Sequence, residues 1–245
     1  MAVSPVSPTE LRAEVERYPW YHSIDLPGGV ETVGMFDHRP VLHHYPLPDD
    51  LSGMRCLDVA TMDGFWAFEM ERRGAESVTA IDLDDPEDLD WPAALRADHD
   101  KALDETKEQR FELAKRTLGS KVERVILSAY DLSPERLGTF DFVFCGDLLV
   151  HLKDPVTPVE NIRSVTTGSA VIVNVITKFR FNESKPMAVL DGIDNFVWWT
   201  TNMAGFARIV RAAGFSRVEE SPTFRLPFRE GGDWEGLRGA VRAYP

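Results

Sequence analysis

Short apolar runs alternate with amphipathic segments from about residue 51 to the end of the chain. Strands are predicted for the apolar runs at 56–59, 77–81, 122–127, 141–145 and 170–176, and helices for the segments at 65–73, 101–118, 158–166 and 203–213. Strands that alternate with helices in this way predict an α/β fold with a doubly wound, Rossmann-like parallel sheet. Two further segments, 217–220 and 237–243, are expected to close the sheet as an antiparallel pair, which gives seven strands.

The first 50 residues precede this pattern and form an N-terminal extension, which we expect to act as a lid over the active site. Within it, a short helix is predicted at 8–18, and the Pro-Gly-Gly turn predicts a hairpin over 24–33. Residues 51–245 form the main domain, with an insertion at 178–200 that is rich in aromatic side chains.

Two acidic strand ends carry the main functional signal. Residues 56–64 read CLDVATMDG, so an apolar strand runs into a turn with Asp58 near its exit, and Gly64 opens the next helix. The second predicted strand ends at Asp82, 24 residues after Asp58. A nucleoside cofactor requires this arrangement, because the first loop brings backbone close to the ligand and the second carboxylate accepts the ribose hydroxyls.

The loop composition distinguishes between two nucleoside cofactors. A dinucleotide requires Gly-x-Gly-x-x-Gly so that its pyrophosphate can approach the backbone amides, but the loop carries Ala60, Met62 and the acidic Asp63. S-adenosyl-L-methionine (SAM) has no phosphate and carries two cationic groups, so it is the predicted cofactor. An alanine at position 60 is a small departure from glycine if its φ is negative, and a serious one if its φ is positive.

The loop resembles the Asp-x-Gly-x-x-x-Gly pattern of class I SAM-dependent methyltransferases, with Ala60 in place of the first glycine. Three segments, 20–36, 195–199 and 212–215, resemble the tRNA wobble-uridine carboxymethyltransferase-like group, and the similarity spans about 18–216. The resemblance implies the strand order 3-2-1-4-5-7-6. The tRNA enzyme of that group uses a carboxylated SAM, but no tyrosine stands beside His151 and no lysine for the extra carboxylate is evident, which favours ordinary SAM.

The predicted cofactor contacts follow from the strand ends and from the resemblance. Asp82 is expected to accept both ribose hydroxyls, and Asp58 either orders the loop, caps the helix, or receives the SAM ammonium through water. In the resembling enzymes, residues after the third strand hold adenine and a small residue after the fourth lies beside the methionyl group. The predicted cofactor-binding residues are Asp58, Ala60, Gly64, Asp82, Leu83, Ala129, Tyr130, Asp131, Cys145 and Gly146.

Methyl transfer to a hydroxyl group requires a base or a metal ion, because the hydroxyl does not ionise by itself near neutral pH. His151 is the predicted general base, and Asp147 is expected to orient it or to bind a divalent ion. A Mg²⁺ site built from Asp147, Asp191 and Asp194 with His151 is a further possibility. Reserve candidates for the base are His22, His43 and His44.

The acceptor side is less defined. The predicted acceptor-binding residues are Tyr21, His22, Trp198 and Trp199; with Phe196, the two tryptophans either pack as core and lid or stack on a sugar ring. We therefore expect O-methylation of a small-molecule or carbohydrate acceptor, such as a glycosylated natural product. The alternatives are a tRNA wobble-uridine-modifying (carboxy)methyltransferase and a non-catalytic SAM-binding protein.

Composition and charge limit the classes of binding partner and of cellular environment that we expect. The formal net charge is −13 and no Lys/Arg cluster is evident, which disfavours nucleic acid. Cys56 and Cys145 lie in apolar runs and are expected to be buried thiols, consistent with a reducing, cytoplasmic environment. No apolar run is long enough to span a membrane, and no signal peptide is recognisable. The oligomeric state stays open, with a homodimer as one expectation.

Overall fold

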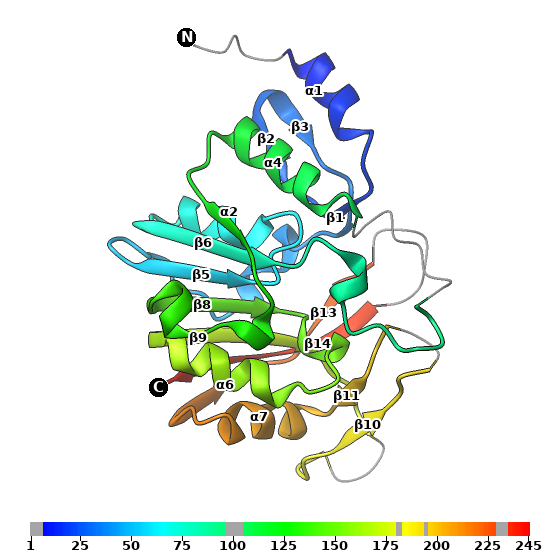
Figure 1. Cartoon of the computed structure of the whole chain (residues 1–245), viewed down its shortest axis with the longest axis vertical. Coiled ribbons are helices and arrows are strands. Elements are labelled where there is room, and N and C mark those ends of the chain that lie inside the picture. Colours follow the sequence, from blue (N-terminus) through cyan, green and yellow to red (C-terminus); the bar gives the residue numbers. More distant parts are fainter. Residues whose placement is uncertain (1–6, 97–104, 180–182, 194–195, 229–234) are drawn as a thin grey trace.

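The computed structural model describes residues 7–96, 105–179, 183–193, 196–228 and 235–245. A central eight-stranded sheet has the order β12-β14-β9-β8-β5-β6-β7, with β13 paired to β14 (Figure 1). The strands are β5 (Arg55–Val59), β6 (Ser77–Asp82), β7 (Glu123–Ile126), β8 (Phe140–Gly146), β9 (Thr166–Val175), β12 (Arg217–Glu220), β13 (Phe224–Pro227) and β14 (Glu235–Tyr244).

This sheet confirms the predicted topology. Strands β5 to β9 pair in parallel, and β14 runs antiparallel between β9 and β12. Counted along the chain without β13, the order is 3-2-1-4-5-7-6, as the methyltransferase resemblance implies. Strand β13 was not predicted, because it is only four residues long and prolines weaken its strand signal: Pro222 precedes the strand and Pro227 is its last residue.

Helices cover both faces of the sheet (Figure 1). On one face, α6 and α7 pack against alternate strand residues such as Val143 and Ile172. On the other face, α2, α4 and the N-terminal segment share a core with Phe142 and Phe144. The helices are α1 (Pro8–Val15), α2 (Phe65–Arg72), α4 (Lys107–Leu118), α5 (Pro134–Leu137), α6 (Val156–Val165) and α7 (Met203–Ala212), with 3-10 turns η1 (Pro27–Gly29), η2 (Arg39–His44), η3 (Pro86–Asp88), η4 (Ala129–Asp131) and η5 (Leu149–His151).

The N-terminal segment docks on the same core. The predicted hairpin forms from β2 (Asp25–Leu26) and β3 (Val30–Glu31). Around it, β1 (Trp20–His22) pairs in parallel with β4 (Gly34–Phe36), a pairing that the sequence did not indicate. Apolar side chains of this segment, including Leu11, Trp20 and Ile24, belong to the core cluster that also contains α2.

The aromatic insertion forms a two-stranded hairpin of β10 (Ala188–Leu190) and β11 (Trp199–Thr201) beside the sheet (Figure 1). Of the helix predicted at 101–118, residues 107–118 are observed as α4, and residues 101–104 lie outside the described part of the chain. Cys56 and Cys145 are both buried free thiols, as predicted. Among the described residues, no helix has the length and apolar character needed to cross a bilayer.

Candidate active site

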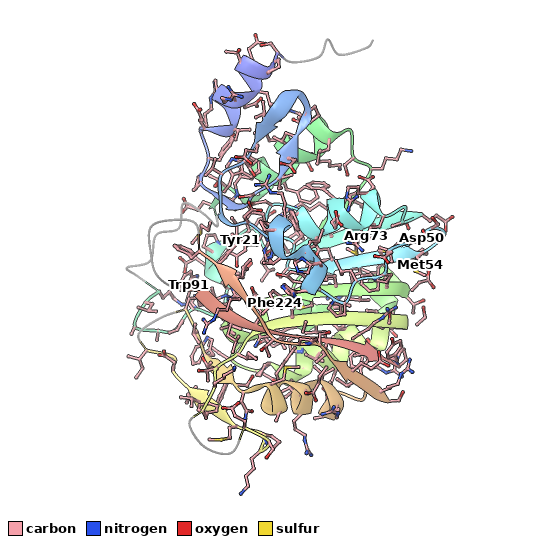
Figure 2. All side chains as sticks on the ribbon, turned by 180° about the vertical axis from the view of Figure 1, so that it is seen from behind. Tyr21, Asp50, Met54, Arg73, Trp91 and Phe224 are labelled. Atoms are coloured by element: carbon pink, nitrogen blue, oxygen red, sulfur yellow. The ribbon has the colours of Figure 1, made fainter. Side chains whose placement is uncertain are left out.

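A cavity of about 280 Å³ lies at the carboxyl ends of the parallel strands, where a doubly wound sheet binds its ligand. Three groups of residues form it: strand ends and their loops, the N-terminal segment, and the chain around Trp91 and Phe196. Figure 2 shows Tyr21 and Trp91, from two of these groups, near this edge of the sheet. The lining includes Tyr21, His22, His38, Tyr45, Ala60, Met62, Trp66, Asp82, Leu83, Trp91, Lys107, Leu127, Ala129, Tyr130, Gly146, Asp147, His151 and Phe196.

Asp82 lies in this cavity at the end of β6. Its Oδ2 accepts a hydrogen bond from the backbone N–H of Met62 at 2.7 Å, which ties the two strand-end loops together. Its Oδ1 accepts from its neighbour Leu83 N at 2.7 Å and from Lys107 Nζ at 3.0 Å. The carboxylate is therefore held in a fixed orientation by three nitrogen donors.

Two non-glycine residues in the loop after β5 have a positive φ, so Ala60 is not a mild replacement for glycine. Ala60 has a φ of 62° and Met62 a φ of 49°, both in the left-handed region that favours glycine. The structure therefore places Ala60 in the more demanding of the two conformations considered, and the loop carries backbone strain at two positions.

Replacing Ala60 by Gly should increase the free energy of unfolding by about 0.5–1 kcal/mol. The left-handed conformation costs a non-glycine residue about 1–2 kcal/mol, and the greater unfolded-state entropy of glycine cancels part of that gain. Urea unfolding followed by circular dichroism measures the change. Ala207→Gly, in the interior of α7, is the control and should instead destabilise by at least about 1 kcal/mol, because it lowers helix propensity and removes a buried methyl group. Equal destabilisation of both variants would contradict the strain argument.

Asp58 orders the start of α2 and does not line the cavity. Its Oδ2 accepts from Thr61 Oγ1 at 2.6 Å and from Ala67 N at 3.1 Å, and 1% of the residue is exposed. Burial is the main cause that raises the pKa of Asp58 to about 7. Of the roles considered for this residue, the loop-ordering and capping contacts are the ones observed.

Asp63 does not face the cavity, contrary to the expectation that an acid in this loop would attract the SAM cation. Its Oδ2 accepts from the backbone N–H groups of Tyr21 at 2.6 Å and His22 at 2.8 Å. Its Oδ1 accepts from Arg110 Nε at 2.6 Å, and both charged side chains are 0% exposed. Asp63 thus joins the loop after β5 to the N-terminal segment and to α4.

The residues expected to hold adenine divide into two groups. Leu83, Ala129 and Tyr130 line the cavity, whereas Asp131 is exposed on η4 and is not among the lining residues. The Tyr130 hydroxyl donates to Oδ2 of Asp90, another lining residue, at 2.7 Å. The expected hydrogen bond from adenine to Asp131 has no support in this geometry.

The end of β8 presents Gly146 to the cavity but not Cys145. A Cβ at position 146 would lie 2.9 Å from the Phe144 ring, so the close packing requires glycine. Cys145 is fully buried in the core on the opposite face, and burial raises the pKa of its thiol, which agrees with the expectation that it is no nucleophile. Gly64 is likewise not among the lining residues; its φ of 91° forms the turn into α2.

Asp147 was expected to orient His151, but the structure shows a different partner for its carboxylate. Its backbone adopts a φ of 51°, and its Oδ2 accepts from Arg238 Nε on β14 at 2.8 Å. Arg238 is 1% exposed, so Asp147 and Arg238 form a nearly buried ion pair beside the cavity. Arg238 was missed because nothing in its local sequence distinguishes it from the other arginines of the last strand.

His151 lies on η5 and lines the cavity. Its Nδ1 is hydrogen-bonded to the backbone carbonyl of Phe196, and the two rings are 4.6 Å apart. Because a carbonyl can only accept, Nδ1 carries a proton, and whenever the ring is neutral its basic lone pair lies on Nε2. Within the part of the chain that the structure describes, the contact that sets this tautomer comes from the main chain.

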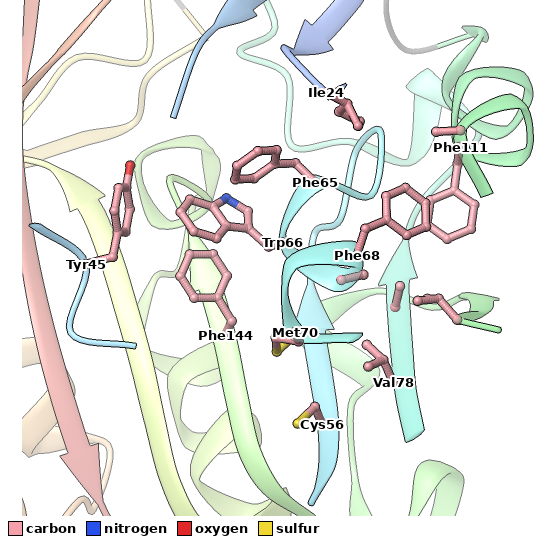
Figure 3. Packing of buried hydrophobic residues seen from close by; sticks show 14 of the residues in the cluster. Ile24, Tyr45, Cys56, Phe65, Trp66, Phe68, Met70, Val78, Phe111 and Phe144 are labelled. Atoms are coloured by element: carbon pink, nitrogen blue, oxygen red, sulfur yellow. The ribbon is translucent and has the colours of Figure 1, made fainter. Parts of the chain in front are cut away.

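The N-terminal segment contributes a cluster of aromatic and histidine side chains to the cavity. His38, which the sequence did not single out, has its Nδ1 2.7 Å from the Tyr45 hydroxyl. Burial lowers the pKa of His22 to about 4, and burial lowers the pKa of His38 well below its ordinary value, so both rings are neutral at pH 7. Figure 3 shows Trp66 between Tyr45, Phe65 and Phe144 in the adjoining core.

The remaining predicted residues lie away from the cavity. His43 and His44 are exposed on η2. The indole N–H of Trp198 donates to the Asp90 carbonyl, and that of Trp199 donates to the Lys153 carbonyl at 2.9 Å. Neither tryptophan is among the lining residues, and the observed contacts agree with packing rather than with a sugar platform.

Phe196 is the member of the insertion that reaches the cavity. Its ring stacks on Trp91 with centroids 3.8 Å apart and an interplanar angle of 19°. Segments more than 100 residues apart thereby form one aromatic wall, held by the Trp198–Asp90 hydrogen bond nearby. This pairing has no counterpart in local sequence patterns.

The expected Mg²⁺ ligands are not brought together. Among the described residues, no three His, Cys, Asp or Glu side chains are arranged so that they could hold a metal ion. Asp147 is paired with Arg238, and Asp191 accepts from Ile193 N at 3.0 Å within its own turn. Asp194 lies outside the described residues.

Comparisons with known proteins bear on this site. No protein-family model matches the chain. A ubiquinone biosynthesis O-methyltransferase of Xanthomonas oryzae pv. oryzae is 32% identical over 106 residues, which are 43% of this chain and 36% of that protein. A magnesium-protoporphyrin O-methyltransferase of Rhodobacter capsulatus is 28% identical over 137 residues, which are 55% of this chain and 50% of that protein. The chain thus spans about a third to a half of the length of these relatives.

Solved structures extend the similarity over the whole chain. The N-terminal domain of EvdMO1, crystallised with SAH and D-fucose, matches with a TM-score of 0.62 and 16% identity, and the match covers 99% of each chain. The Burkholderia thailandensis 1,6-didemethyltoxoflavin-N1-methyltransferase matches with a TM-score of 0.51 and 16% identity over 79% of this chain and 72% of that one. The fold is therefore that of the class I SAM-dependent methyltransferases. The closer resemblance to the wobble-uridine group is not confirmed.

Proposed function

We propose that this protein binds SAM and transfers its methyl group to a hydroxyl group of a small-molecule or carbohydrate acceptor. One observation carries the proposal: Asp82 lies in the cavity at the carboxyl end of β6 and is joined to the loop after β5. In this fold, that position serves the ribose of a nucleoside cofactor.

The loop geometry favours SAM over a dinucleotide. A pyrophosphate requires backbone N–H groups at the helix N-terminus, but the Met62 N–H already donates to Asp82. Among the described residues, four aspartates, Asp82, Asp88, Asp90 and Asp147, line the cavity with a single lysine, Lys107, and this balance suits a cationic ligand better than an anionic one. The structural neighbours that contain SAH support the same choice.

The cavity offers distinct surroundings for the parts of the reaction. Among the lining residues, we assign Leu83 and Ala129 to adenosine, Gly146 to the methionyl part, and Tyr21 and His151 to the acceptor. Methyl transfer from a sulfonium is an in-line displacement, so the protein aligns acceptor oxygen, methyl and sulfur and removes one proton. His151 is the proposed base, since its Nδ1–H is held by a carbonyl and Nε2 can take the proton.

The comparisons support a hydroxyl acceptor. Both curated relatives are named O-methyltransferases, and the EvdMO1 domain was crystallised in the presence of D-fucose, a hydroxylated sugar. Neutral His38 and Tyr45 add hydrogen-bonding groups suited to a hydroxyl at the inner end of the cavity. We therefore favour an uncharged, hydroxylated small molecule as the acceptor.

Replacing Asp82 by Ala should weaken SAM binding at least ten-fold, because a hydrogen bond to a charged group contributes about 1.5–3 kcal/mol. Isothermal titration calorimetry measures the affinity. Asp131→Ala is the matched control, since Asp131 follows the next strand but is exposed and does not line the cavity. Unchanged affinity in Asp82→Ala would reject the assigned pocket.

Two other functions make different predictions. A tRNA-modifying enzyme would retain tRNA at low salt and release it as salt rises. A non-catalytic SAM-binding protein would bind SAM but turn over no acceptor. Incubation with labelled SAM and a panel of sugars, phenols and tRNA, with and without EDTA, separates these functions from O-methylation of a small molecule.

A further inference from the structure

We infer that Lys107 is a cofactor-binding residue that shares recognition of the ribose hydroxyls with Asp82. The inference rests on the proposed function, because it assigns a role within the same cofactor site. The observation is that Lys107 lines the cavity, is 2% exposed, and has its Nζ 3.0 Å from Asp82 Oδ1. From its place at a strand end, Asp82 alone was expected to accept both ribose hydroxyls.

The number of acceptor sites on Asp82 argues for this division. A carboxylate offers about four lone-pair sites on its two oxygens. Leu83 N and Lys107 Nζ occupy the two sites of Oδ1, and Met62 N occupies one site of Oδ2. One site is left for a ligand while these contacts persist, so Asp82 can accept one ribose hydroxyl but not both.

The second hydroxyl then needs another partner, and the ammonium group next to Asp82 supplies it. A hydroxyl can accept a hydrogen bond as well as donate one, and an ammonium has three donors and no acceptor. A ribose diol placed against the Asp82–Lys107 pair would donate from one hydroxyl to Asp82 Oδ2 and accept at the other from Lys107 Nζ. The carboxylate of Asp82 thereby binds a hydroxyl that donates, and the ammonium of Lys107 binds a hydroxyl that accepts.

Helix α4 holds Lys107 in place for this role. Lys107 is the first residue of α4, and Arg110, one turn later, forms the fully buried ion pair with Asp63. The same helix therefore anchors to the loop after β5 through Arg110 and to the end of β6 through Lys107. The backbone from which the Lys107 side chain extends is therefore fixed relative to Asp82.

Binding of SAH and of its 2′-deoxy and 3′-deoxy analogues to wild-type protein and to Lys107→Met tests the inference by calorimetry. Lys107→Met should weaken SAH binding about ten-fold, as expected for loss of a hydrogen bond from a charged donor. For the analogue that lacks the hydroxyl held by Lys107, the loss should fall below about two-fold. Lys107→Arg should recover part of the affinity for SAH. Lys115→Met, on the same helix and ion-paired with Glu112 near the surface, should match the wild type.

Equal losses for SAH and both analogues would show that Lys107 only supports the fold, and unchanged SAH binding would exclude a role in binding; either result overturns the inference and leaves the proposed function intact. Failure of the wild-type protein to bind SAH would overturn both. Should Lys107→Met not fold, the comparison of Asp82→Asn with Asp82→Asn/Lys107→Met replaces it. The single variant should then still distinguish one deoxy analogue from SAH, and the double variant should not.

Discussion

Replacing Arg110 by Met should lower the free energy of unfolding by about 3–5 kcal/mol, which is typical when one partner of a buried ion pair is removed. Asp63 would keep its two backbone donors, Tyr21 N and His22 N, but would lose the only charge observed to compensate it among the described residues. In a protein of this size, such a loss lowers the melting temperature by roughly 6–20 °C. Urea unfolding and thermal melting followed by circular dichroism measure both quantities.

The controls separate the ion pair from general effects on α4. Arg116 lies on the same helix and pairs with Glu14, but 53% of its side chain is exposed, so Arg116→Met should cost less than about 1 kcal/mol. Asp63→Asn combined with Arg110→Met removes both charges and should recover part of the loss. A loss in Arg110→Met no larger than that in Arg116→Met would show that the pair does not hold the N-terminal segment.

Replacing His151 by Ala should reduce the rate of methyl transfer to an identified hydroxyl acceptor by about 10²–10⁴-fold, the usual contribution of a general base. The affinity for SAM should change little, because the loss concerns proton removal and not cofactor binding. The measurement is kcat with saturating SAM, together with the SAM dissociation constant by calorimetry. His43→Ala is the matched control, since His43 is exposed and does not line the cavity.

A wild-type rate in His151→Ala would remove His151 from the catalytic role without affecting the methyltransferase proposal. His38 would then be the next histidine to replace, because its ring also lines the cavity and contacts Tyr45. If His151→Ala lowered both the rate and the affinity for SAM, the contact between His151 and Phe196 would be needed for the shape of the part of the cavity that binds SAM.

The sheet and the place of Asp82 at a strand end were predictable because each depends on a local signal. Apolar strand runs with regular spacing predict the parallel sheet, and the position of Asp82 at a strand end follows from that register. The short hairpin formed by β2 and β3 was predictable for the same reason, since the Pro-Gly-Gly turn lies between its strands.

Side-chain direction within the loops was not predictable. Asp63 and Asp82 are both acidic residues beside the cofactor loop, yet Asp63 points away because its partner Arg110 lies 47 residues further along the chain. Asp131 follows Tyr130 directly but is exposed, because η4 turns only one of the two side chains toward the cavity. A strand-end position identifies the region of a site but not which neighbours enter it.

Residues supplied by distant segments were missed for a related reason. His38, Lys107 and Arg238 reach the cavity or its edge from the N-terminal segment, α4 and β14, and none follows a parallel strand. Their placement depends on how these elements dock, which is a property of the assembled core. The density of histidine and aromatic residues between positions 20 and 45 was the only signal that pointed toward one of them.

The contact between Asp63 and the backbone of Tyr21 and His22 has a consequence for protein engineering. The N-terminal segment supplies Tyr21, His22, His38 and Tyr45 to the cavity. Its backbone is bound by the carboxylate of Asp63, more than 40 positions later, and Asp63 is in turn paired with Arg110 on α4. A chimera that exchanges this segment with that of a relative to alter acceptor range should exchange positions 63 and 110 as well, so that the buried carboxylate that binds its backbone keeps its partners.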